Sequence, residues 1–456
     1  MRLTHPSAAA IAPLLLALCL AAGCRRAAPD GVALVGATLI DGSGGPALPD
    51  AAIVVRGGRI ESVGTRAGFQ LPDRTVQVDV AGRWIIPGLI DAHAHVEPWA
   101  LPRYLAWGVT TVRDLHGNLD SILQLRREVN SGAIPGPRIY SAGAMIDGLP
   151  TTYPDAIGAN NARDARRAVD RLVNAGVDLV KVYTRVDPIL LKAVIDEAGT
   201  FNLRVTGHLG LTDALTAARE GITSIEHLSG VPEACAADAS SLYAAHYRGF
   251  FPGWTAFERS WAGLDSDALD RVAAELAQRK TLLVPTLVLH ETFSRLDDPV
   301  VLRDTMLRAV PQLQQQRWNV PDMVRRAGWT EQDYPAFRAA RPQQDRFLRL
   351  FAAAGGRIVT GTDASNQLLI PGYSEHRELQ LLVGAGLSPR DALLAATRNG
   401  ALILGVDSLG LIAPGKAADL VVLTRDPLAD IRNSLAIDRV MSRGALFSAD
   451  SIRKAW

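Results

Sequence analysis

The sequence has few cysteines and no excess of charge of either sign. Only three cysteines occur in 456 residues, and 48 lysines and arginines balance 47 aspartates and glutamates, for a net charge of +1. No basic tract is present, so nothing in the charge pattern points to nucleic acid. Hydrophobic residues make up 48% of the chain and charged residues 21%, which is typical of a globular protein with a large core.

The N-terminus has no apolar run long enough for a comfortable membrane span. The run from Ala8 to Ala22 is short for that purpose. It follows Arg2 and precedes small residues, which is the order of a secretion signal. We therefore expect residues 1–23 to be a signal peptide and the mature protein to be exported.

The end of this run resembles a bacterial lipobox, Leu20 to Cys24, although Ala21 stands where leucine is usual. The resemblance implies cleavage before Cys24 and a lipid on its thiol, which would anchor a periplasmic protein to the surface of the outer membrane. Secretion without a lipid is the alternative. With Cys24 lipidated and Cys19 removed, Cys235 is left alone, which excludes an intramolecular disulfide.

The remaining chain divides by pattern into two kinds of structure. Short apolar runs separated by glycine-rich turns predict a small β unit before residue 83, and similar strands return after residue 400. We expect the two ends to build one β-sandwich domain. The predicted boundaries are a tether over 24–31, the two parts of the sandwich over 32–82 and 401–456, and a hydrolase barrel over 83–400.

Between these ends, apolar strands alternate with amphipathic helical stretches. Such alternation favours an α/β fold, here a (β/α)8 barrel of the TIM type. The predicted barrel strands are Trp84–Ile90, Thr110–Arg113, Arg138–Ser141, Val177–Tyr183, Arg204–His208, Thr223–His227, Leu282–Leu287 and Arg357–Thr362.

Two segments after barrel strands are longer than one helix needs, Gly230 to Leu264 and Leu287 to Arg357. Segments that follow barrel strands lie on the catalytic rim. They are therefore either a cover over the site or a packing surface between subunits of a homo-oligomer, and the sequence leaves both open.

Polar residues stand at the ends of these apolar strands. His93 and His95 end the first one, and side chains two residues apart on a strand share a face. Two imidazoles in that position can chelate one metal ion. Four further polar residues lie in or at the ends of later strands, and all strand ends of a barrel meet at one face: Lys181, His208, His227 and Asp363.

Four histidines, one aspartate and one lysine suit two metal ions better than a single tetrahedral zinc. An ammonium group would repel the cations. A carbamate formed from Lys181 and CO2 removes this conflict, because it is an anion whose two oxygens can bridge both ions.

These motifs resemble the amidohydrolase superfamily, specifically its binuclear, carboxylated-lysine members related to imidazolonepropionase and to Xaa-Pro and Xaa-Arg dipeptidases. The resemblance covers nearly all of the mature chain. It is carried by residues 87–95, 108–114 and 180–182, by the pairs Gly207-His208 and Glu226-His227, and by residues 361–363 and 415–423.

The resemblance implies two divalent metals, with zinc the best suited to imidazole and oxygen ligands. His93, His95 and Asp363 would bind one ion, His208 and His227 the other, and carboxylated Lys181 would bridge them with a hydroxide. Asp363 would then pass the proton of the hydroxide to the leaving nitrogen of a small amide, cyclic amide or dipeptide-like substrate.

Tyr183 shares a strand face with Lys181 and is the second catalytic candidate, placed to hold an oxyanion or a carboxylate. Of the other histidines, His116 and His290 are candidates for substrate contact, and His376 is expected to be structural. Arg113 is expected to pair with a carboxylate.

The alternatives are a dipeptidase, an esterase, lactonase or phosphotriesterase with the same metals, and a non-catalytic ligand-binding lipoprotein. Related dipeptidases carry a Ser/Thr-Gly-Gly run after the lysine, whereas this chain continues Tyr183-Thr184-Arg185. Related mononuclear deaminases carry glutamate where this chain has Leu211, so hydrolysis is favoured over deamination.

Overall fold

The computed structural model describes residues 30–454. The predicted signal peptide, Cys24 and most of the predicted tether lie outside the described residues. Within the described part, no helix has both the length and the apolar character that crossing a membrane requires.

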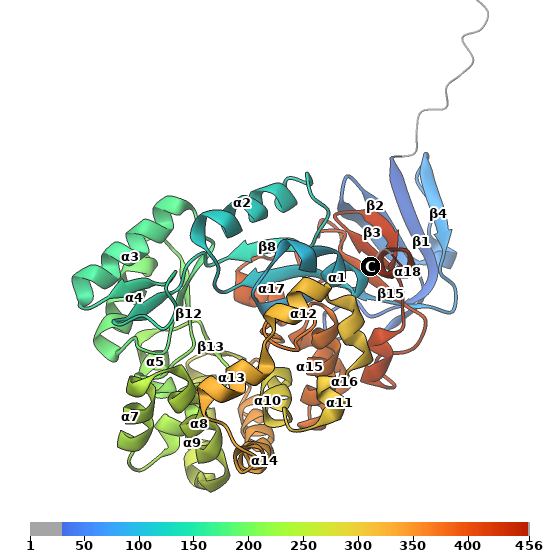
Figure 1. Cartoon of the computed structure of the whole chain (residues 1–456). Helices are drawn as coiled ribbons and strands as arrows, with labels where there is room; N and C mark the ends of the chain where they lie inside the picture. Colours follow the sequence, from blue (N-terminus) through green and yellow to red (C-terminus); the bar gives the residue numbers. More distant parts are fainter. Residues whose placement is uncertain (1–29, 455–456) are drawn as a thin grey trace, which may run out of the picture.

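Both ends of the chain contribute strands to one eight-stranded sheet. Seven of its strands follow the order β17-β16-β15-β5-β1-β2-β3, and the eighth strand, β4, pairs with β1 outside this order. In Figure 1 the blue N-terminal and red C-terminal strands lie side by side next to the barrel. Leu34, Ile53 and Ile85 pack with Leu420 and Met441 in one apolar core. The predicted joining of the two ends is confirmed. The strands are β1 (Gly31–Leu39), β2 (Leu48–Arg56), β3 (Arg59–Thr65), β4 (Thr75–Asp79), β5 (Trp84–Pro87), β15 (Leu420–Leu423), β16 (Ile437–Ser442) and β17 (Ala445–Ser448).

The single barrel strand predicted over Trp84–Ile90 is wrong. The apolar run is divided at Gly88 into β5, which pairs with β15 and β1 in the small sheet, and β6 (Leu89–Ala94), which pairs with β7 (Val109–Asp114) in the barrel. A Cβ on residue 88 would lie 2.1 Å from Thr110 Oγ1. Glycine therefore lets the chain pass close to β7 as it changes sheets.

Strands are present in six of the other seven predicted barrel segments, whereas Arg357–Thr362 makes only isolated bridges. The fold is the expected α/β barrel with a small β domain. β6, β7 and β8 (Arg138–Ser141) form one parallel arc. A second arc is formed by β11 (Leu179–Val182), β12 (Arg204–Gly207), β13 (Ser224–Glu226) and β14 (Leu282–Val284), and the short strands β9 (Ile146–Gly148) and β10 (Ile157–Ala159) extend its sheet beyond β11. The backbone bond from Asp178 N to Ser141 O, 2.9 Å, joins the arcs. Residues 357–364 close the ring by bridging Leu283 on one side and Ala94 on the other.

Helices pack around this ring, and residues next to their ends satisfy the terminal backbone groups. Asn161, Asp187 and Asp213 each accept a backbone N–H at the first turn of the helix that follows, and Gly176 and Gly221 end helices in the left-handed conformation. The main surrounding helices are α1 (Leu101–Ala106), α2 (Leu119–Asn130), α3 (Ala162–Ala175), α4 (Pro188–Thr200), α5 (Ala214–Glu220), α9 (Ser266–Gln278), α14 (Asp333–Ala353), α15 (Tyr373–Gly384), α16 (Pro389–Ala395) and α17 (Arg398–Leu404).

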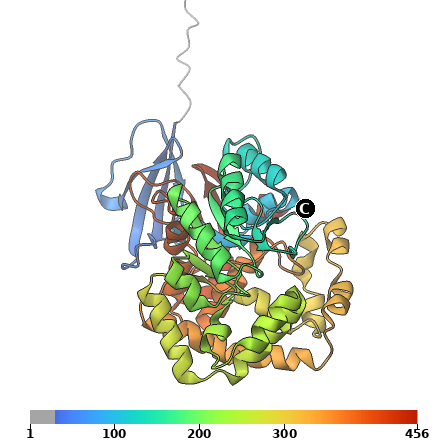
Figure 2. The same ribbon diagram turned by 90° about the vertical axis from the view of Figure 1, so that its left-hand side faces the viewer.

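The two long segments are helical and lie at one end of the barrel, where Figure 2 shows the yellow-green and orange helices together. The first contains α6 (Val231–Cys235), α7 (Ser240–Arg248) and α8 (Phe250–Ser260). The second contains α10 (Leu287–Ser294), α11 (Pro299–Leu302), α12 (Gln312–Arg317) and α13 (Val320–Ala327) before α14. We call these two sets of helices the cap.

Candidate active site

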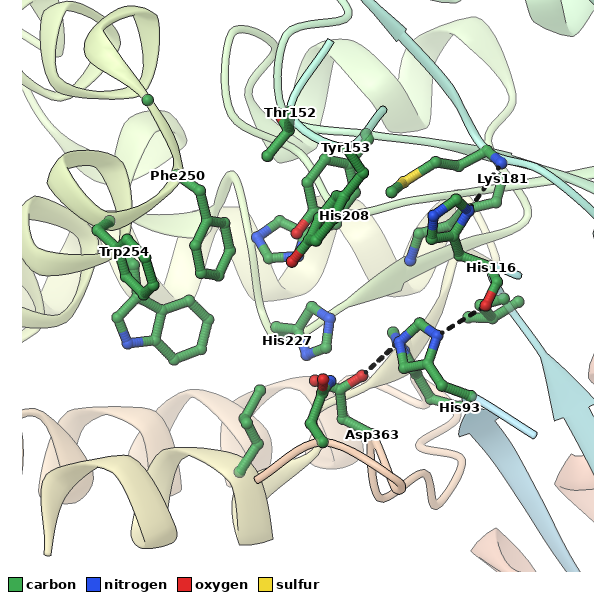
Figure 3. Close-up of a pocket in the computed structure, with 18 of the residues that line it drawn as sticks. His93, His116, Thr152, Tyr153, Lys181, His208, His227, Phe250, Trp254 and Asp363 are labelled. Carbon is green, nitrogen blue, oxygen red and sulfur yellow. Dashed lines mark hydrogen bonds and ion pairs between the residues drawn. The ribbon is translucent and has the colours of Figure 1, made fainter. Parts of the chain in front are cut away.

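The polar residues predicted at the strand ends surround one space (Figure 3). His93, His227 and Asp363 each place a ligand atom within 4.8 Å of the other two. Asp363 Oδ1 lies 3.1 Å from His93 Nε2 and 2.9 Å from His95 Nε2. The ring centroid of His208 lies 4.5 Å from that of His227. Five of the six predicted metal ligands therefore form one connected group.

The sixth predicted ligand, Lys181, lines the same cavity as the histidines and is buried. It projects from β11, which pairs with β12, the strand that precedes His208. Burial lowers the pKa of the Lys181 amine to about 8. A larger fraction of this amine is therefore neutral near pH 7 than in an exposed lysine.

Each of three histidines has its Nδ1 atom held by a neighbour. His93 Nδ1 contacts Glu226 Oε2 at 2.7 Å, and His227 Nδ1 contacts Thr286 Oγ1 at 2.7 Å. His95 Nδ1 lies 3.1 Å from the carbonyl oxygen of His116. These contacts fix the ring orientation and occupy Nδ1, so Nε2 is the atom of each ring that can act as a metal ligand.

The charge states also suit a divalent cation. Burial and the neighbouring charged groups hold the pKa values of His208 and His227 well below the ordinary value, so both rings are neutral and keep a lone pair. Against the cost of burial, His93 and His95 hold the pKa of Asp363 well below its usual range. Burial lowers the pKa of His95, but Asp363 raises it to about 8 overall, so the ring carries a second proton near pH 7. A bound cation would displace that proton.

A buried network lies behind His93. Glu226 accepts a hydrogen bond from Arg113 Nη2 at 2.8 Å and from Ser224 Oγ at 3.0 Å, and it is also bonded to Thr206. Despite burial, Arg113 and His93 hold the pKa of Glu226 well below its usual range. The expected pairing of Arg113 with a carboxylate is confirmed, and its partner is the residue that orients His93.

The backbone is strained at the same place. His227 and Asp363 have φ angles of 60° and 61°, and Thr286, which holds His227, has a φ of 48°. Non-glycine residues seldom adopt this left-handed region. Residues held in it cluster at active sites, although turn residues of this chain such as Asn202 and Lys280 adopt it too.

A cavity of about 650 Å³ opens above these residues. The cap provides one part of its wall with residues such as Phe250, Trp254 and Phe293, while Tyr153, Tyr183 and Arg185 line another part. Both cap segments therefore cover the site, which was one of the two predicted roles. The volume of the cavity suits a small-molecule substrate.

Tyr183, predicted as catalytic, lines the cavity with its ring centroid 4.9 Å from that of His208. Burial raises its pKa well above the usual value, so the phenol keeps its proton and can donate it in a hydrogen bond. Tyr153 packs against it with ring centroids 5.7 Å apart.

The other histidines differ in their surroundings. His116 lines the cavity and contacts Asp155, so it stays a candidate for substrate contact. His290 is buried behind Trp254 with Glu258. His376 bonds Ser434 and the Trp107 carbonyl, both at 2.9 Å, as expected of a structural residue.

Sequence reasoning did not assign Glu226, Thr286 or Tyr153 to the site. Glu226 directly precedes His227, and a charged residue inside an apolar strand was a signal that could have been used. Thr286 and Tyr153 lie in other segments, and only the folded chain brings them to His227 and Tyr183.

Comparisons with known proteins agree with this geometry. The model of the Amidohydrolase family matches residues 84–446. Ochratoxinase of Aspergillus niger is 24% identical, with 91% of this chain and 86% of that protein covered. Imidazolonepropionase of Rhizobium rhizogenes is 23% identical, with 88% of this chain and 93% of that protein covered.

Among solved structures, that of a bottromycin amidohydrolase is 25% identical with a TM-score of 0.73, over 94% of this chain and 89% of that one. The family match spans most of the chain, including every strand of the barrel and all six predicted ligands. The chain therefore belongs to the amidohydrolase family and is a hydrolase that acts on carbon–nitrogen bonds.

Proposed function

We propose that the protein hydrolyses an amide, cyclic amide or dipeptide-like bond of a small molecule with the help of two divalent metal ions. The observation that carries this proposal is the convergence of His93, His95, His227 and Asp363 at the base of a covered cavity. His93, His95 and Asp363 would hold one ion, and His208 and His227 the other. Zinc is the metal that best suits these donors.

When bound, the two ions would lower the pKa of a shared water molecule and polarise the substrate carbonyl. Asp363 is ionised and lies at the junction of the histidines, so it can take the proton of the attacking water and deliver it to the leaving nitrogen. Tyr183, which stays protonated, can donate a hydrogen bond to the oxyanion of the substrate. The cap limits the access of bulk water.

We further propose that Lys181 carries a CO2-derived carbamate that bridges the two ions. A neutral amine is the form that reacts with CO2, and the lowered pKa of this buried lysine favours that form. The carbamate also replaces a cation with an anion among the metal ligands, which removes an electrostatic conflict.

The test is the Lys181→Ala variant, with Lys192→Ala on the exposed face of α4 as control. Activity is measured on paired amide and ester substrates and on a dipeptide library, with zinc and bicarbonate supplied. We expect Lys181→Ala to lose activity, with partial rescue by short carboxylic acids, while the control keeps it. Full activity of Lys181→Ala would contradict the bridging role.

The substrate pairs also separate the alternative functions. Hydrolysis of the esters alone would favour an esterase or lactonase with the same residues. A dipeptidase is the closest alternative, and a solved Xaa-Pro dipeptidase shares the fold at 21% identity with a TM-score of 0.68 over 92% of this chain and all of that one. The segment after Lys181 lacks the expected glycines, so we favour other amides.

We also propose that the protein is exported to the periplasm and anchored through a lipid on Cys24, which rests on the lipobox-like stretch before it. In cells fed labelled palmitate, the protein should carry label and sediment with outer membranes. The Cys24→Ser variant should lose the label, and Cys235→Ser should keep it. An unlabelled wild-type protein would indicate secretion without a lipid.

A further inference from the structure

The cavity above the candidate metal ligands has one continuous apolar wall. Its apolar lining from the cap is Phe250, Phe251, Trp254, Leu289, Phe293 and Met323. Apart from the candidate ligands, the charged side chains that line the cavity are those of Arg185 and Arg326. Neither residue lies on α8 or α10. A substrate group that faces α8 and α10 therefore meets apolar side chains, among which the indole nitrogen of Trp254 is buried.

This wall begins directly beside two predicted metal ligands. The ring centroid of Phe250 lies 5.9 Å from that of His208, and that of Trp254 lies 6.3 Å from that of His227. Figure 3 shows Phe250 and Trp254 together on one side of His208 and His227. A group attached close to the reacting carbonyl can therefore reach the wall without a long linker.

The wall is held rigidly from behind. Trp254 stacks on His290 with ring centroids 5.2 Å apart and an interplanar angle of 21°, and His290 is bonded to Glu258. Phe293 packs against Trp254 at 5.8 Å and against Trp329 at 5.8 Å. Because these rings are already fixed, an apolar ligand would lose little free energy in ordering them.

We propose that this wall is a specificity subsite for an aromatic ring or a branched aliphatic group that the substrate carries next to its scissile bond. The inference rests on the proposed metal-dependent function, since it places the reacting bond over His208 and His227. Phe250 and Trp254 provide the surface on which the group packs. Small substrates without such a group bind at the same metal ions but leave the wall exposed to water.

The test measures binding rather than turnover. Two hydroxamates, which bind metal ions through the same head group, are titrated calorimetrically into the zinc-loaded full chain: acetohydroxamic acid and phenylacetohydroxamic acid. The phenyl compound should bind about 10- to 100-fold more tightly to the wild-type protein, because it removes an aromatic ring from water.

Phe250→Ala and Trp254→Leu should each reduce this preference, the ratio of the two affinities in the same variant, by about tenfold. Binding of acetohydroxamate by the variant shows that it is folded. The control is Tyr247→Ala on α7, whose ring is 69% exposed and does not line the cavity. It should keep the full preference.

Equal affinity of the wild-type protein for both hydroxamates would overturn the subsite while leaving the metal-dependent function standing. A preference that survives both Phe250→Ala and Trp254→Leu would also overturn it. Binding of neither compound would contradict the proposed function itself, and the subsite with it.

Discussion

His93 makes a close contact at each ring nitrogen, and the two partners have different roles. Asp363 lies at Nε2, on the cavity side, and Glu226 lies at Nδ1, on the buried side. Glu226 is in turn held by Arg113, so the ring that faces the cavity is fixed by a chain of charged hydrogen bonds. Partners of this kind orient metal-bound histidines and raise their basicity.

We therefore predict that Glu226→Gln lowers metal affinity by about 10- to 100-fold. The variant keeps the shape of the side chain but removes the negative charge that orients His93. Affinity is measured by competition for zinc with a chelator. The measurement is made below the unfolding temperature of the variant, because removing the charge that pairs with Arg113 also lowers the stability of the fold by about 3 kcal/mol. Glu275→Gln, in an exposed pair with Arg219, should bind metal as the wild type does. Unchanged affinity in Glu226→Gln would exclude the orienting role.

At this scale the sequence was informative wherever a polar residue interrupts or ends an apolar strand. Burying such a residue is costly without a partner, which is why His93, Lys181, His227 and Asp363 could be selected before the structure was known. The partners themselves were harder to find. Thr286 follows a different strand from His227, and no local pattern relates the two.

At the scale of single elements, α10 is tied to α15 through a buried carboxyl. Glu378 Oε2 accepts the backbone N–H of Val288 at 2.8 Å, at the first turn of α10. Thr286, the residue just before α10, does not cap the helix with its side chain. Its hydroxyl instead contacts His227. The start of α10 therefore connects a candidate metal ligand, a cap helix and a barrel helix.

Burial raises the pKa of Glu378 to about 8 from its ordinary value of 4.5. The folded protein therefore keeps a proton that the unfolded chain loses, so the contribution of Glu378 to stability falls as the pH rises from about 4.5 to about 8. We predict that Glu378→Gln removes this loss. Its melting temperature relative to the wild type should rise between pH 5 and pH 9, by about 2 °C or more.

The matched control is Glu331→Gln at an exposed position, whose difference from the wild type should stay constant over the same pH range. Both differences are measured by calorimetry in the same buffers. A Glu378→Gln difference that does not change with pH would show that this carboxyl is ionised in the folded protein.

The pattern of apolar residues predicted the helices and strands well, but it did not predict which sheet each strand joins. The run Trp84–Ile90 is uniformly apolar, because both β5 and β6 are buried, and so the change of sheet at Gly88 leaves no trace in hydrophobicity. The close approach of Gly88 to Thr110 is a tertiary contact. Such contacts decide where a continuous apolar run is divided.

At the scale of the whole molecule, the ends of the chain meet in one sheet beside the barrel, and the cap covers the site. The barrel and the joined ends could be predicted, because alternating strands and helices have few compact arrangements. The division into domains at residues 82 and 400 and the formation of a homo-oligomer stay predictions.

The two roles considered for the long segments could not be separated from sequence, because an apolar helix face can cover a cavity or pack on another subunit. The cap residues that line the cavity show that these helices cover the site. Packing of the same helices on another subunit stays a prediction. Phe250 and Trp254 of α8 lie beside the candidate metal ligands His208 and His227.

The central claim is that six polar side chains from strands far apart in the sequence hold two metal ions together. Metal content tests it most directly. Protein prepared with zinc and bicarbonate and freed of loosely bound ions by gel filtration is analysed by elemental mass spectrometry. We predict about two zinc ions per chain, and about one or none in a variant that combines His208→Ala with His227→Ala. One zinc ion or fewer in the wild-type protein would contradict the account.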